Sequence, residues 1–163
     1  MFGLKSINKE AIPRALEKAE RYRLLNESAE AESICLDVLQ IDPDNQQALI
    51  MLLLALTDQF NRRLPETRPR ELLARLHGEY ERAYYAGIIC ERKARAHLDL
   101  DYPGARFAAY EGLREAMIWY EKAEEIRPQG NDDSILRWNA CARTIMDSQL
   151  VPRSVEEFEP SLE

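Results

Sequence analysis

The chain has 163 residues, of which 45% are hydrophobic and 31% charged, a balance typical of one soluble globular domain with a single core. Its 29 acidic and 22 basic residues give a net charge of −7, which argues against a nucleic-acid partner, because phosphate backbones repel acidic domains. The longest apolar run, residues 48–56, is about half as long as a membrane span, so we expect no membrane partner either.

The cysteines and the first residues of the chain bear on the cellular compartment. Cys35, Cys90 and Cys141 are odd in number, far apart and set among apolar residues, which favours free thiols in a reducing compartment. The first twenty residues lack the apolar run of a secretory signal and are too acidic for a transit peptide. Together these features predict a cytoplasmic protein.

Apolar residues at intervals of three and four predict helices along most of the chain. The expected helices cover, in chain order, residues 9–25, 28–41, 45–63, 70–100, 105–126 and 133–149. The stretch 70–100 is either one long helix or two shorter ones, because Gly78 and Gly87 are weak points within it. No stretch shows the strict alternation of a half-buried strand. The predicted fold class is therefore all-α, with about six helices.

One spacing of residues occurs twice along the chain. Intervals of four, three and five residues separate Ala31, Cys35, Val38 and Pro43, and the same intervals separate Ala116, Tyr120, Ala123 and Pro128. Residues at four-then-three spacing lie on one face of a helix, and a proline five residues later ends that helix. The spacing predicts a helical repeat.

The first helix pair resembles a tetratricopeptide repeat, a 34-residue helix–turn–helix unit. Counting back from Pro43, Ala19 stands where that family prefers a small residue, Tyr22 where it prefers an aromatic one, and Ala31 at the small position that opens the second helix. Cys35 and Val38 replace the usual aromatic residue and alanine. These two replacements are mild departures from the pattern.

The second copy and the residues after it also resemble this family. Tyr120 and Ala123 are of the preferred types. The opening helix of a further unit is resembled by Trp138, Cys141, Ala142 and Ile145, with Cys141 and Ile145 in place of the usual leucine and tyrosine. Pro43 and Pro128 are 85 residues apart, whereas two repeats would separate them by 68, which leaves 17 extra residues. We expect this insertion to lengthen the fourth and fifth helices or to add a short one.

The resemblance implies antiparallel helix hairpins stacked as a short α-solenoid over residues 1–150. Members of this family bind peptides or partner surfaces along the first helices of their hairpins. Carried over by position, the groove would contain Glu20, Arg23, Leu24, Gln47, Ile50, Leu54 and Asp58. Leu16 and Glu20 stand where some members hold basic and amide groups that bind a terminal carboxylate. The resemblance therefore disfavours such a ligand and favours an apolar or basic helical segment.

Residues of catalytic type form no recognisable site in the sequence. Neither His77 nor His97 has a glutamate three residues before it, as a di-iron bundle requires. There is no glycine pattern of a P-loop or a dinucleotide site. Asp99 and Asp101 flank a turn, where helix capping is the expected role. We therefore expect no metal, no cofactor and no enzymatic activity.

Two clusters are open to either a structural or a binding role. The aromatic cluster comprises Tyr80, Tyr84, Tyr85, Tyr110, Trp119 and Tyr120. It either packs helices together or forms a hot spot for binding a partner. The basic stretch comprises Arg62, Arg63, Arg68, Arg70 and Arg75. It is either a solvent-exposed loop with the start of a helix, or a binding patch for an acidic partner. For both clusters we favour the structural role over the binding role.

Two hypotheses about function follow from the sequence. The first is a protein-interaction module, an adaptor, scaffold or chaperone-like protein, that binds a protein or peptide partner in its groove. The second is a self-associating module that stacks through its terminal helices, with a homodimer formed through the last helix, because Ile135, Leu136, Trp138 and Ile145 make that helix apolar. Residues 151–163 are predicted to form an acidic flexible tail, with docking of Phe158 and its neighbouring glutamates as the alternative.

Overall fold

The computed structural model describes residues 1–154 and confirms an all-helical chain, with no strand in that range. Its elements are η1 (Lys9–Ala11), α1 (Ile12–Leu24), α2 (Ser28–Ile41), α3 (Gln46–Thr57), η2 (Phe60–Arg62), α4 (Thr67–Leu73), α5 (Glu79–Leu100), α6 (Ala105–Glu125) and α7 (Asp133–Asp147), of which η1 and η2 are 3₁₀-helices. The predicted tail falls mostly on residues outside this range. Leu150, the last buried residue described, packs against the C-terminal helices.

Most predicted helix ends agree with the structure, and the middle of the chain differs. Asn45 caps α3 by accepting a hydrogen bond from the Ala48 amide at 2.9 Å. This helix ends at Thr57 instead of about residue 63. The stretch 70–100 is two helices, because Gly78 is extended and begins α5 after the short α4 has ended. The described residues thus form seven α-helices where about six were expected.

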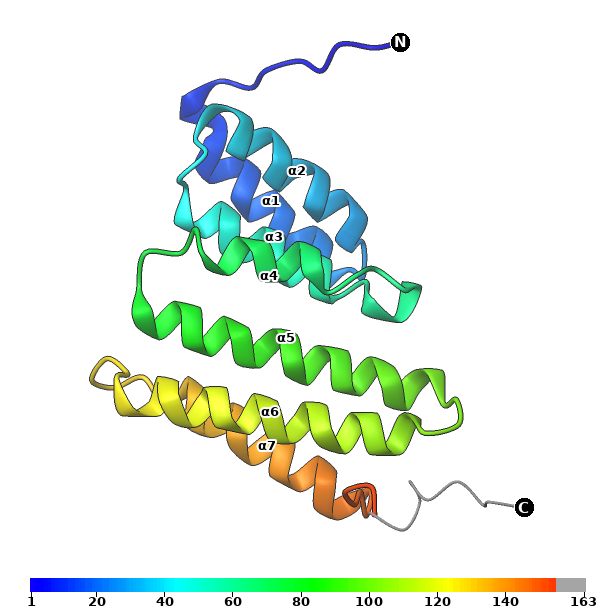
Figure 1. Ribbon diagram of the computed structural model, residues 1–163. Coiled ribbons are helices and arrows are strands. Elements are labelled where there is room, and N and C mark those ends of the chain that lie inside the picture. Colours follow the sequence, from blue (N-terminus) through cyan, green and yellow to red (C-terminus); the bar gives the residue numbers. More distant parts are fainter. Residues whose placement is uncertain (155–163) are drawn as a thin grey trace.

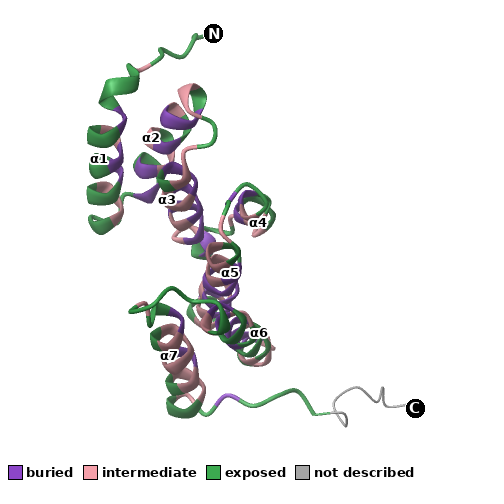
Figure 2. Cartoon of the chain, turned by 90° about the vertical axis from the view of Figure 1, so that its left-hand side faces the viewer, coloured by how far each residue is buried: buried purple, intermediate pink, exposed green. Residues whose placement is uncertain are grey.

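Successive helices pack as hairpins that stack from α1 and α2 at one end to α7 at the other (Figure 1). The pairs are α1 with α2, α3 with α4, and α5 with α6, and α7 then packs on α6. The first helix of each pair lies on the same side of the stack. Figure 2 shows that α1 and α7 project to this side at the two ends, while α3 and α5 lie further back between them. The stack therefore curves.

Both copies of the repeated spacing lie in the core. All six apolar residues of the two copies, Ala31, Cys35, Val38, Ala116, Tyr120 and Ala123, are fully buried. Pro43 and Pro128 are exposed just beyond the ends of α2 and α6. Ala19 is buried, and Tyr22, Trp138 and Ala142 are half-buried against the cores. The spacing thus marks the faces along which paired helices approach.

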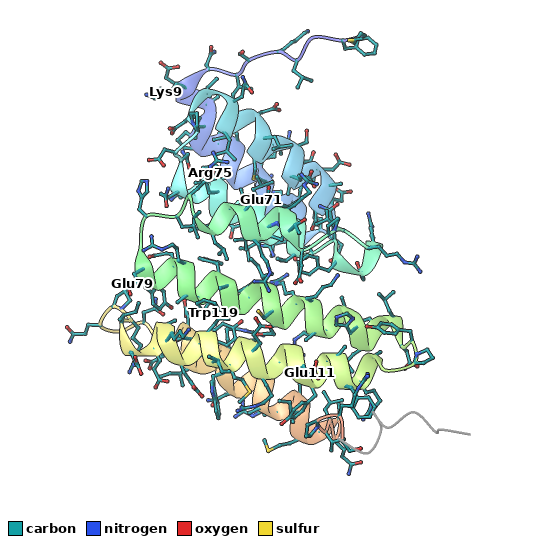
Figure 3. All side chains as sticks on the ribbon, viewed as in Figure 1. Lys9, Glu71, Arg75, Glu79, Glu111 and Trp119 are labelled. Atoms are coloured by element: carbon teal, nitrogen blue, oxygen red, sulfur yellow. The ribbon has the colours of Figure 1, made fainter. Side chains whose placement is uncertain are left out.

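The protein has two hydrophobic clusters where the sequence predicted a single core. One cluster joins α1 to α4, and the other joins α5, α6 and α7. Helix α5 contributes to both, since Ile89 belongs to the first and Ile88 to the second. Two clusters form because a stack of hairpins buries the interface between each hairpin and the next, instead of surrounding a single core. Charged side chains such as Glu71, Arg75, Glu79 and Glu111 cover the outside (Figure 3).

The extra residues between the two copies lie in long helices and in an added short one. Helices α5 and α6 have 22 and 21 residues, whereas α1 and α2 have 13 and 14. Along the chain, the seven-residue helix α4 comes between the N-terminal helices and this long hairpin. Both expected forms of the insertion are therefore present.

Gly87 of α5 allows a close approach of α5 to the Tyr120 ring of α6. A Cβ atom at this position would lie 2.5 Å from Cε1 and 2.8 Å from Cδ1 of Tyr120. The Tyr120 ring is fully buried, and its hydroxyl donates a hydrogen bond to Glu91 at 3.0 Å, so the ring has no room to move. The absence of a side chain at Gly87 therefore lets the Tyr120 ring pack directly against α5.

We predict that Gly87→Ala destabilises the protein, although alanine is the better helix former. Overpacking against Tyr120 should lower the free energy of unfolding by about 1–3 kcal/mol. Urea unfolding followed by circular dichroism measures this change. Gly3→Ala is the control, because a Cβ at Gly3 meets open space. A Gly87→Ala variant more stable than the wild type would contradict the packing argument.

Candidate binding groove

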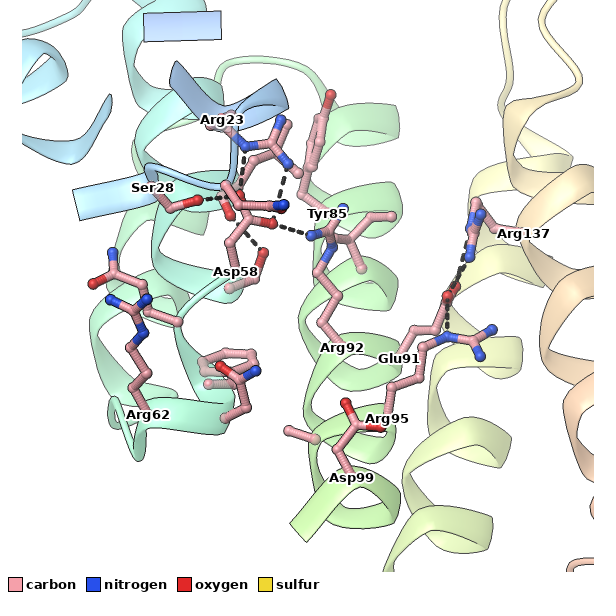
Figure 4. Close-up of a pocket in the computed structure, with 18 of the residues that line it drawn as sticks. Arg23, Ser28, Asp58, Arg62, Tyr85, Glu91, Arg92, Arg95, Asp99 and Arg137 are labelled. Atoms are coloured by element: carbon pink, nitrogen blue, oxygen red, sulfur yellow. Dashed lines mark hydrogen bonds and ion pairs between the residues drawn. The ribbon is translucent and has the colours of Figure 1, made fainter. Parts of the chain in front are cut away.

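A groove of about 780 Å³ lies on the side of the stack where the first helices are found. It is lined by α1, the end of α3, the segment around η2, α5 and α7. Figure 4 shows two groups of charged side chains in this groove, one around Asp58 with Arg23 and Arg92 and the other around Glu91 with Arg95 and Arg137. The second helices α2, α4 and α6 contribute no lining residue except Ser28, the first residue of α2.

Asp58 connects the two halves of the stack from one wall of the groove. It follows α3 directly and accepts a hydrogen bond from Arg23 Nε at 2.7 Å and another from the Ser28 hydroxyl at 2.8 Å. Arg92 of α5 forms an ion pair with the same carboxylate (Figure 4). Four helices, α1, α2, α3 and α5, are therefore joined at a single side chain.

Glu91 of α5 has the same role on the other side. It is 2% exposed and accepts a hydrogen bond from Arg95 Nε at 2.9 Å and from the Tyr120 hydroxyl at 3.0 Å. Arg137 of α7 forms a bidentate pair with its two carboxylate oxygens. Arg95 also donates to the Thr144 hydroxyl of α7 at 3.0 Å. Helices α5, α6 and α7 are thus joined at the Glu91 carboxylate.

Both carboxyl groups are stabilised in their ionised form. Burial raises the pKa of Asp58, but hydrogen bonds from Arg23 and Ser28 and the charge of Arg92 outweigh it, so the pKa lies below its ordinary value. Burial likewise opposes ionisation of Glu91, and the hydrogen bonds and charges of Arg137 and Arg95 bring its pKa below the ordinary value. Neither carboxylate therefore tends to take up a proton at neutral pH.

Positive charge exceeds negative charge along the groove. The lining contains five arginines, Arg23, Arg62, Arg92, Arg95 and Arg137, and three acidic residues, Asp58, Glu91 and Asp99. The net charge of the lining is therefore +2, while the whole chain carries −7. Asp58 and Glu91 are each shared by two arginines, so each carboxylate neutralises only half of the charge around it.

Apolar side chains lie between and beside the charged ones. Leu24, at the end of α1, is 77% exposed at the edge of the groove. Leu54, Tyr84 and Tyr85 are half-buried in its lining. The Tyr84 ring packs edge-on against Tyr85, with the ring centres 5.0 Å apart. The groove thus offers both hydrogen-bond donors and apolar contacts to a ligand.

The structure brings four of the seven sequence-predicted groove residues into this lining, namely Arg23, Leu24, Leu54 and Asp58. The other three lie elsewhere. Glu20 and Gln47 are exposed outside the groove, and Ile50 packs against the N-terminal core. Each of the three lies farther from the ends of α1 and α3 than the residues that line the groove.

Sequence reasoning missed the contribution of α5 and α7. Glu91 and Arg95 stand four residues apart, and Ile88, Glu91, Arg92 and Arg95 follow helical spacing, so their common face was visible in the sequence. Nothing in the sequence indicated that this face would meet Asp58, which is 34 residues from Arg92. Of the basic stretch only Arg62 lines the groove; Arg68 and Arg70 pair with Glu32 and Glu66 outside it.

Groups of catalytic type are dispersed over the part of the chain that the structure describes. No three His, Cys, Asp or Glu side chains among residues 1–154 are grouped as a metal site would require. Burial raises the pKa of the Cys35 and Cys141 thiols to about 12 and that of Cys90 to about 11, which keeps them protonated and unreactive. The aromatic cluster is chiefly structural, since Tyr120 is fully buried and Tyr84 stacks on Tyr80.

Comparisons of the chain with protein-family models, with curated proteins and with solved structures find no match. Within residues 1–154, every helix is too short or too polar to cross a membrane. The groove and its chemistry are therefore the observations from which a function can be argued.

We predict that Glu91→Gln lowers the free energy of unfolding by about 3 kcal/mol, because it removes the buried partner of both Arg95 and Arg137. Urea unfolding measures the change. Glu111→Gln on the exposed surface of α6 is the matched control and should change stability by less than about 0.5 kcal/mol. Equal effects of the two substitutions would show that Glu91 does not hold the helices together.

The lowered pKa values of Asp58 and Glu91 predict a loss of stability in acid. A carboxyl group whose pKa is lower in the folded chain stabilises it at pH values above its unfolded pKa, near pH 4, and this contribution is lost as the pH falls through the folded value. The urea midpoint should therefore stay nearly constant between about pH 7 and pH 5 and decrease below about pH 4. In Glu91→Gln the decrease should be smaller, and an identical decrease would contradict this assignment.

Proposed function

We propose that the protein is a non-enzymatic interaction module that binds a segment of a partner protein in the groove formed by its first helices. The observation that carries this proposal is that α1, α3, α5 and α7, which are distant in sequence, together line one groove with donors and apolar groups. A stack of hairpins with such a groove serves to present a surface rather than to perform chemistry.

The resemblance to tetratricopeptide repeats supports the same proposal. In that family the first helices of the hairpins line the binding face, and the corresponding helices line the groove here. The small residues that the resemblance places between paired helices, Ala19, Ala31 and Ala116, are fully buried. An adaptor, scaffold or chaperone-like role in the cytoplasm is the function that fits this arrangement.

Self-association through the last helix is the second candidate, and one observation favours it. Leu136 and Met146 of α7 are 62% and 66% exposed, and among the described residues no helix packs on α7 from the side away from α6. Ile135 and Ile145 are only half-buried on the same helix. A second copy of the chain could cover these side chains.

Two exposed leucines test the proposed function. Peptides selected from a displayed random library for binding to the wild type should bind Leu24→Ser about tenfold more weakly, because Leu24 lies at the edge of the groove. Leu36→Ser on α2 is the matched control, since Leu36 is 47% exposed outside the groove, and it should leave the affinity unchanged. Fluorescence anisotropy gives both affinities.

Two results of this experiment would oppose the proposal. Peptides that lose affinity in Leu36→Ser but not in Leu24→Ser would place the binding surface outside the groove. A chain that selects no peptide and instead forms a dimer lost in Leu136→Asp would favour self-association, which light scattering detects.

A further inference from the structure

The charge pattern of the groove indicates what kind of segment it would bind, an inference that rests on the proposed function. The lining carries +2, so the remaining 143 residues of the chain carry −9. A positive groove in an acidic protein directs an acidic ligand to this site, since the rest of the surface repels it.

The arginines of the groove keep hydrogen-bonding capacity that their ion pairs do not use. A guanidinium group has five N–H donors in a planar fork. Arg92 donates to Asp58 from Nη1 alone, and Arg137 donates to Glu91 from Nε and Nη2. The side chains of Arg92, Arg95 and Arg137 are each about a third exposed, at 35%, 36% and 37%. Their remaining donors are available to further carboxylates.

Two charged groups in the lining have no ionic partner among the described residues. The side chains of Arg62 and Asp99 form no hydrogen bond or ion pair within residues 1–154, although both line the groove. Their charges can therefore be changed without breaking the interactions that hold the helices together. They provide a test of the charge of the groove that leaves the fold intact.

We infer that the groove binds an internal segment of a partner protein that carries glutamate or aspartate side chains beside apolar residues. The partner's carboxylates pair with the unused donors of Arg92, Arg95 and Arg137, and its apolar residues contact Leu24 and Tyr85. These arginines lie on α5 and α7, away from Leu16 and Glu20, where a clamp for a terminal carboxylate would stand. The ligand chemistry is therefore that of side-chain carboxylates.

The residues that the sequence resemblance placed in the groove favoured an apolar or basic partner segment. That expectation included Glu20, which lies outside the groove, and lacked Arg62, Arg92, Arg95 and Arg137, which lie inside it. The observed lining loses Glu20 and gains these four arginines together with Glu91 and Asp99. Its net charge is therefore +2, whereas the residues expected from the sequence carried −1, and this reverses the preferred charge of the ligand. The inference of an acidic segment follows from this difference.

Two amidated helical peptides test this inference. Both have leucine at every third or fourth position, and the polar positions are all glutamate in one and all lysine in the other. The glutamate peptide should bind more tightly, and its affinity should decrease as salt rises from about 0.05 M to about 0.5 M, because ions screen its attraction to the arginines. Equal binding of the two peptides, or tighter binding of the lysine peptide, would overturn the inference.

Charge reversal at the two unpaired positions gives opposite expected effects. Arg62→Glu should weaken binding of the glutamate peptide about fivefold, and Asp99→Lys should strengthen it by a similar factor. Arg114→Glu, an exposed change on α6 outside the groove, is the control with no expected effect. Unchanged affinity in both groove variants would overturn the inference, and the Leu24→Ser result still decides the proposed function separately.

The acidic C-terminal residues of this chain are the competing occupant. Residues 155–163 contain four glutamates and no basic residue. If they occupy the groove, replacing Glu156, Glu157 and Glu159 with glutamine in the full chain should increase the affinity for the glutamate peptide severalfold. Such an increase would assign the groove to this segment and overturn its assignment to a partner, whereas unchanged affinity supports the partner.

Discussion

Glu91 and Arg92 are consecutive residues of α5, and their side chains form ion pairs with opposite halves of the molecule. Glu91 binds Arg137 of α7, and Arg92 binds Asp58 at the end of α3. Successive residues of a helix point about 100° apart, so one helix can make both connections only if it lies between the two halves. The position of α5 between two hydrophobic clusters is thus the constraint on which the groove depends.

The same ion pairs explain why the groove is positive. A buried carboxylate is stable as an anion only when charges and donors compensate for the water that it loses. Asp58 and Glu91 each meet this requirement with two arginines from different helices. The second arginine of each pair ties another helix to the stack and at the same time adds an uncompensated charge to the groove. Stability and ligand preference therefore depend on the same side chains.

The function proposed for this arrangement needs no chemistry from the protein. The thiols are buried and protonated, while the exposed apolar and cationic groups of the groove suit the recognition of another chain. No family model, curated protein or solved structure matches the chain, so the side chains that meet in the groove carry the functional proposal. The helices that line the groove are the first of each hairpin. On this point the sequence resemblance and the geometry agree.

The sequence by itself determined the helices, most of their ends and the buried face of each hairpin, since these follow from local spacing. Ala31, Cys35 and Val38, and their counterparts Ala116, Tyr120 and Ala123, were identifiable as core positions from intervals of three and four residues. Only the tertiary structure decided where α3 ends, that α4 is separate, and which charges share the groove. Arg92 and Asp58 are 34 residues apart, and Glu91 and Arg137 are 46 apart. Helical periodicity places a side chain on its own helix, whereas the packing of α5 against its neighbours brings these distant side chains together.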